Sequence, residues 1–127
     1  MVAKHSNYSI QNHFPEGYES SKNLYEEFQN KLLALDSRIQ PDPKKKYIGF
    51  KIGSKVVIAV SVLQSKLKLQ LYRVEPSDLI DPNNKVKYKS NSFEDFNKYI
   101  SMFDIVTIED VDYGIGLSKQ VIQKFFN

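Results

Sequence analysis

The sequence predicts an α+β fold in which an antiparallel sheet of about four strands carries an N-terminal and a C-terminal helix packed on it. Residues 44–74 contain three successive runs rich in β-branched residues, separated by short turns, and an amphipathic helical pattern lies on either side of this stretch. The chain has 127 residues, the length of one domain. We expect an N-terminal arm over residues 1–17 and a single domain over residues 18–127.

The first helix is predicted from about residue 20 to residue 35. Four apolar side chains recur there at the spacing that places them on one helical face: Leu24, Phe28, Leu32 and Leu35. Ser20 or Ser21 could cap the start of this helix. The next residues, 36–45, include two prolines, which lack the backbone N–H that a helix or a central strand requires. We therefore expect a connector there.

The middle of the chain predicts a hairpin-linked set of strands. A two-residue turn at residues 53–54 would place Phe50 opposite Val57, on the face away from Ile58, and a slip of one residue would exchange the two faces. The middle strand, residues 56–63, is apolar on both faces. This pattern is expected of a strand that is covered on both sides. Helices on both faces, or a helix on one and another subunit on the other, would provide that cover.

The chain beyond residue 75 predicts two more strands. Residues 85–89 alternate with period two, as expected of an edge strand, and residues 103–106 form a further apolar run. Between these two strands, a short helix is predicted because three apolar side chains recur at helical spacing: Phe93, Phe96 and Ile100.

The C-terminal residues predict an amphipathic closing helix. Thr107 and Asp110 have the spacing of a capping box, in which the side chain of each residue accepts a hydrogen bond from the backbone of the other. Gly114 and Gly116 lie inside this helix, where each glycine costs about 1 kcal/mol relative to alanine. Close approach of the helix to the sheet would explain both glycines.

The composition indicates a reducing compartment. The chain has no cysteine, so it can form neither a disulfide framework nor a thiolate metal site. No apolar run approaches the ~18 residues of a membrane span, and the N-terminal residues lack the apolar core of a signal peptide. We therefore expect a cytoplasmic protein without a membrane partner.

Charge is segregated along the chain. The formal net charge is +3, yet residues 44–89 carry 11 basic and three acidic side chains, a local net charge of +8. The rest of the chain carries a net charge of −5. Such segregation can create a surface that attracts anions. Lysines also protect the edges of a sheet from aggregation, and this structural role is the alternative explanation.

Six short segments occur in a familiar order: LYEEF (24–28), LALD (33–36), KYIGFK (46–51), KLKL (66–69), DP (81–82) and VDY (111–113). This succession resembles a small family of unknown function whose members are often labelled "predicted transport protein". They frequently form the C-terminal domain of restriction-like nucleases, including modification-dependent ones. The family's glycine-rich loop before the last strand is absent, and only Asp104 matches its final acid. The resemblance implies an accessory domain found beside DNA-processing enzymes.

Together with the accessory role that the resemblance implies, the basic segment leads us to expect a non-catalytic accessory module that binds DNA or RNA. Lysine and arginine bind phosphates, and exposed aromatic rings stack on bases. The candidate nucleic-acid-binding residues are Lys46, Tyr47, Lys51, Lys66, Lys68, Arg73, Lys85, Lys87 and Lys89. Tyr72 and Tyr88 are further stacking candidates, although all three tyrosines could equally be half-buried strand residues.

A protein-interaction or homodimerisation domain is the alternative hypothesis. The doubly apolar middle strand and the aromatic-rich residues 93–103 would suit a surface that a partner covers. The partner would then be a nuclease or a second copy of the chain.

The sequence does not predict an enzyme. An active site needs a nucleophile beside a base, carboxylates at a fixed separation, or metal ligands. The two histidines, His5 and His13, have no third ligand nearby, and the paired acids Glu109 and Asp110 are explained by helix capping. We therefore expect no catalytic residue, no metal site and no cofactor.

Overall fold

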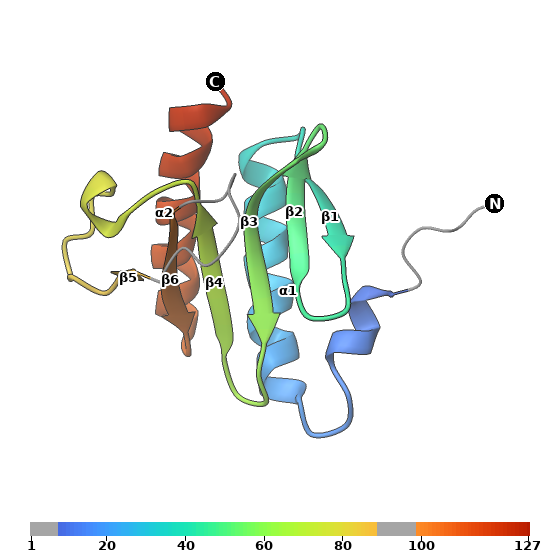
Figure 1. Ribbon diagram of the computed structural model, residues 1–127. Coiled ribbons are helices and arrows are strands. Elements are labelled where there is room, and N and C mark those ends of the chain that lie inside the picture. The colour runs from blue at the N-terminus through green and yellow to red at the C-terminus, as the bar shows by residue number, and fades with distance from the viewer. Residues whose placement is uncertain (1–7, 89–98) are drawn as a thin grey trace.

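The computed structural model describes residues 8–88 and 99–127, and within these residues six strands form one antiparallel sheet. In Figure 1 the helices α1 (Glu19–Leu35) and α2 (Ile108–Phe125) lie side by side against one face of this sheet. The strands, in the spatial order β1-β2-β3-β4-β6-β5, are β1 (Gln40–Pro43), β2 (Ile48–Ile52), β3 (Lys55–Val62), β4 (Leu67–Tyr72), β6 (Ile100–Ile105) and β5 (Lys87–Tyr88). The α+β class with two flanking helices is confirmed, whereas the expected number of about four strands is too low.

The strand that the sequence did not predict is β1, which lies within the supposed connector. It pairs with β2, with Pro41 opposite Phe50 and Pro43 opposite Ile48. Proline is tolerated here because β1 is an edge strand, where one side of the backbone needs no partner in the ladder. The prolines therefore mark the edge of the sheet.

The register of the first hairpin differs from the prediction by one residue. The turn at residues 53–54 is confirmed, but Phe50 lies opposite Ile58 and Lys51 opposite Val56. This shift is a β-bulge that leaves Val57 as an extra residue in β3. Phe50 consequently lies on the same face as Ile58.

The core lies between the helices and this face of the sheet. Rings of Phe28 on α1 and Phe50 on β2 meet edge to face, with their centroids 6.2 Å apart. A Cβ added to Gly114 on α2 would lie 3.2 Å from Leu69 and 3.3 Å from Ile105, so close approach to the sheet explains this glycine. Gly116 has no neighbour within 4 Å of such a Cβ, and the same explanation is wrong for it.

The two helices begin differently. The backbone N–H of Asp110 donates to the Thr107 hydroxyl, and the Asp110 carboxylate accepts from the Thr107 N–H, so the predicted capping box of α2 is confirmed. The N-cap of α1 is Tyr18, which makes no side-chain capping bond. Ser21 instead donates its hydroxyl to the carbonyl of Leu63, which ties α1 to the loop after β3.

Two predicted elements near β5 and β6 are revised. The edge strand shortens to Lys87–Tyr88, because the N–H groups of Lys85 and Val86 donate to the Asp81 carboxylate. Ile100 begins strand β6, so the short helix predicted to include it is wrong at that residue. Phe93 and Phe96 lie outside the described residues.

No described helix packs on the second face of the sheet. Two side chains of β3 on that face are nevertheless buried, with Val57 1% and Ala59 0% exposed, whereas Ser61 is half-buried. Part of the middle strand is therefore covered on both sides within one chain, and helices supply the cover on only one side. Within residues 8–88 and 99–127, no helix combines the length and apolar character needed to cross a membrane.

Candidate functional site

Several predicted site residues meet on the sheet face turned away from α1 and α2. We call this surface the lysine face, after Lys51, Lys66, Lys68 and Lys87. Lys68 lies opposite Asp104, and Lys87 lies opposite Met102, so the ladder places both on the side away from the helices. Lys51 and Lys66 lie on the same side, because they form ion pairs with Asp42 and Asp104, whose side chains point to that side.

Two aspartates neutralise part of the lysine face. The Nζ atoms of Lys44 and Lys51 each lie 3.4 Å from Asp42 Oδ2. Lys66 Nζ lies 3.0 Å from Asp104 Oδ2. Lys68 and Lys87 have no ion pair within the described residues. These two lysines are therefore the cations of this surface that are most available to an external anion.

The three tyrosines differ in exposure. Tyr47 is half-buried and its ring lies beside Gly49. A Cβ added to Gly49 would lie 3.4 Å from Tyr47 Cε1. Tyr72 is 9% exposed, and its burial, together with the nearby Tyr47, raises its pKa to about 12. Tyr88 on β5 is 48% exposed. Tyr72 thus fits the description of a buried strand residue. Tyr88 is the most exposed of the three rings, but it lies opposite Ser101 and therefore on the helix side of the sheet, away from Lys87.

Arg73 lies away from the lysine face, at the C-terminal end of α2. It has a positive φ of 71°, and its Nη1 donates to the carbonyl of Val56 at 2.7 Å. Its guanidinium lies 5.7 Å from the ring centroid of Phe126. Since Val56 adjoins the bulge in β3, Arg73 satisfies a carbonyl group where the ladder is interrupted.

The remaining candidates are dispersed. Lys46 is exposed in the turn between β1 and β2. Lys85 Nζ is turned toward α2, 3.6 Å from Asp110 Oδ1 and 5.5 Å from the ring centroid of Tyr113. Lys89 lies outside the described residues. The structure therefore places four of the predicted basic residues on one face of the sheet, and it places Lys46, Arg73 and Lys85 elsewhere.

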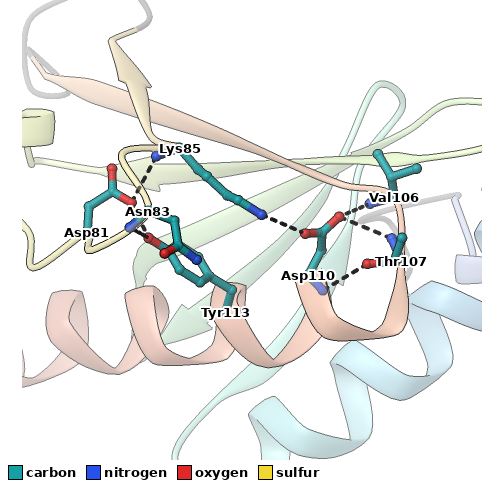
Figure 2. Close-up of polar contacts among 7 residues, drawn as sticks. All are labelled: Asp81, Asn83, Lys85, Val106, Thr107, Asp110 and Tyr113. Atoms are coloured by element: carbon teal, nitrogen blue, oxygen red, sulfur yellow. Dashed lines mark hydrogen bonds and ion pairs between the residues drawn. The ribbon is translucent and has the colours of Figure 1, made fainter.

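A polar network joins the loop before β5 to α2, and Figure 2 shows its members. The Asp81 carboxylate accepts hydrogen bonds from the Tyr113 hydroxyl and from the N–H groups of Lys85 and Val86. Tyr113 in turn accepts from the N–H of Asn83 at 3.0 Å. Burial alone would raise the pKa of Asp81, but these hydrogen bonds outweigh it and hold the pKa below its usual value.

Asp110 forms the other half of this network. Its Oδ2 accepts from the N–H groups of Val106 and Thr107, at 2.9 and 3.1 Å. Burial alone would raise the pKa of Asp110. These hydrogen bonds and the nearby Lys85 have the opposite effect and outweigh burial, so the pKa is below its usual value. The carboxylate therefore remains charged and caps the helix.

Sequence reasoning did not identify this network, although the sequence held a signal for it. Asp81 belongs to the DP segment and Tyr113 to the VDY segment of the resemblance, and the structure joins them by a hydrogen bond. A cavity of about 360 Å³ lies beside the network and reaches the lysine face. Its lining residues are Asn84, Lys85, Lys87, Met102, Phe103, Asp104 and Asp110.

The described residues contain no group of three or more His, Cys, Asp or Glu side chains that could hold a metal ion. His13 Nε2 lies 2.8 Å from the carbonyl oxygen of Lys44, which fixes the N-terminal segment to the turn between β1 and β2. His5 lies outside the described residues.

Comparison with known proteins gives a limited result. The chain is 28% identical over 116 residues to a protein of Haemophilus influenzae Rd described as "Uncharacterized protein". The match covers 91% of this chain but 37% of that protein, so the chain spans little more than a third of its relative's length. No family model and no solved structure matches the chain.

Proposed function

We propose that this chain is a non-catalytic accessory module that binds nucleic acid through the lysine face. The observation that supports the proposal most strongly is the register of β4, β6 and β5. It brings Lys68 and Lys87 to one face without an ion pair in the described residues, and the same face carries Lys51 on β2 and Lys66 before β4. Cationic side chains on one surface are what phosphate binding requires.

The ligand expected on this surface is a single strand. A sheet face with cationic side chains can follow the backbone of an unpaired strand. Tyr88 on β5 is exposed, but it lies opposite Ser101 and therefore on the helix side of the sheet, so the cationic side chains are the contacts expected on the lysine face. The primary contact is therefore expected to be with phosphates, with little sequence preference.

The accessory role has separate support. The matched stretch makes up 37% of the H. influenzae protein, so a similar region occurs as one part of a longer chain. A restriction or defence context and a nuclease partner, which the resemblance implies, remain predictions.

The absence of catalysis is also part of the proposal. In the polar network, Asp81 accepts hydrogen bonds from three groups, and Asp110 accepts from two backbone N–H groups and lies beside Lys85. The Tyr113 hydroxyl both donates and accepts. Groups engaged in this way stabilise the fold, and an active site would need at least one group directed at a substrate.

Fluorescence anisotropy with a labelled single-stranded DNA of about 20 nucleotides tests the proposal. Binding is expected at about 50 mM salt and should weaken steeply as salt rises, because phosphate contacts release counterions. A duplex of the same sequence and a single-stranded RNA are the comparisons. Absence of binding to all three at low salt would refute the proposed function.

The alternative, a homodimerisation or protein-interaction domain, stays a prediction. The doubly apolar middle strand, one of the two observations that led to this alternative, does not require a partner. Val57 and Ala59 on the second face of β3 are already buried in the single chain. Light scattering at high protein concentration would reveal a dimer.

A further inference from the structure

A second cavity, of about 360 Å³, lies between α1, β1 and the short 3-10 helix η1 (Ile10–His13). We call it the α1 cavity. Its apolar walls come from Ile10, Phe14, Tyr25 and Pro43. A cavity of this size is at the small end of ligand-binding sites, which are typically apolar with a few placed polar groups.

The aromatic wall of the α1 cavity is fixed in place. The ring of Tyr25 is 1% exposed, and its centroid lies 5.4 Å from that of Phe14 and 6.3 Å from that of Phe50 in the core. On the opposite side, the contact between His13 and the carbonyl of Lys44 holds η1 against the sheet. The cavity is therefore formed before any ligand arrives.

Most polar groups of the cavity come from one face of α1, and Gln11 of η1 adds an amide. The Tyr25 hydroxyl donates to Gln29 Oε1 at 2.6 Å, so the amide oxygen of Gln29 is occupied and its NH₂ group is left to donate. Glu26 lies one turn before Gln29, and Lys22 one turn before Glu26. Within the described residues, neither Glu26 nor Lys22 has an ion pair or a side-chain hydrogen bond.

From this arrangement we propose that the α1 cavity binds a guanine base. Guanine presents a carbonyl oxygen beside two N–H donors along one edge of a planar ring. The NH₂ group of Gln29 would donate to the carbonyl, the carboxylate of Glu26 would accept from both donors, and Phe14 would contact the ring. Adenine offers an amino group where guanine has the carbonyl, so it would present a donor to the donor of Gln29.

Lys22 extends this recognition to a nucleotide. Lys22 lines the same cavity, and its ammonium group can pair with a phosphate attached to the sugar of the bound base. The α1 cavity is distinct from the lysine face, so this proposal does not depend on the proposed function.

Titration calorimetry of the full chain with guanosine 5′-monophosphate is the direct test. We expect a Kd below about 1 mM, with adenosine 5′-monophosphate at least about tenfold weaker. Inosine 5′-monophosphate, which lacks the 2-amino group, should bind about tenfold more weakly than the guanosine nucleotide, because one hydrogen bond to a charged group is lost. Absence of binding, or equal affinity for guanine and adenine nucleotides, would overturn the proposal.

The variant Glu26→Gln provides the residue-level test. It should weaken binding of the guanosine nucleotide at least about tenfold, since an amide cannot accept from both donors. Glu27→Gln is the matched control, because Glu27 pairs with Lys31 at 3.4 Å and does not line the cavity. Unchanged affinity in Glu26→Gln would contradict the assignment. A Lys68→Gln/Lys87→Gln variant should retain full nucleotide affinity, which separates this site from the lysine face.

Discussion

The two faces of strand β4 show how this chain separates stability from recognition. Leu67, Leu69 and Leu71 point toward the helices and are each 0% exposed. Lys68 and Gln70 alternate with them, point to the other face and remain partly exposed. Period-two alternation therefore assigns neighbouring residues to different roles. Substitutions on the helix side should alter the free energy of unfolding, and substitutions on the lysine side should alter binding.

Leu69→Ala should have the largest effect on stability. It would leave a cavity beneath α2, and the expected loss in the free energy of unfolding is about 2–5 kcal/mol. Its neighbour Lys68→Ala should change the same quantity by no more than about 0.5 kcal/mol. Urea denaturation of the two variants makes the comparison. Similar losses in both would show that the lysine face is also structural.

The glycines of α2 give a second contrast on the helix side. Gly114→Val should cost about 1–3 kcal/mol, because its Cβ would already lie 3.2 Å from the Leu69 side chain. Gly116→Ala should raise the free energy of unfolding by up to about 1 kcal/mol, because open space surrounds that position. Thermal denaturation would measure both. A stabilising Gly114→Val would mean that α2 does not pack as closely as described.

Asp81→Asn tests whether the polar network is structural. The pKa of Asp81 is lowered in the folded state, so its stabilising contribution is present above the unfolded pKa of about 3.9 and is lost as pH falls through the folded value. Near pH 7 the variant should lose about 1–2 kcal/mol, since its hydrogen bonds to a charged acceptor become neutral. Denaturation at a series of pH values should show the difference from the parent chain shrinking below about pH 4. A pH-independent difference would contradict this assignment.

The elements that the sequence predicted well are those with a long local pattern. Apolar spacing located α1 to within one residue at its start, and Thr107 with Asp110 marked the start of α2. Local patterns fail where one residue changes the register. The bulge at Val57 places Phe50 on the face of Ile58, opposite to the face that was predicted. No local sequence pattern in β2 or β3 predicts this bulge.

The sites depend on contacts that are distant in sequence. The Asp81–Tyr113 hydrogen bond joins residues 32 positions apart, and the α1 cavity combines η1, α1 and β1. The basic residues were visible in the sequence, but their grouping was not. Strand pairing decides that Lys68 and Lys87 share a face, whereas Arg73 donates to the carbonyl of Val56, 17 positions earlier in the chain.

The salt dependence of single-stranded DNA binding by Lys68→Gln/Lys87→Gln tests the central claim most directly. If both lysines contact phosphates, the slope of log K against log salt should fall in magnitude by about 1.4 relative to the parent chain. Lys119→Gln, on an exposed position of α2, is the matched control and should leave the slope unchanged. An unchanged slope in the double variant, or an equal reduction in the control, would contradict the assignment of nucleic-acid binding to the lysine face.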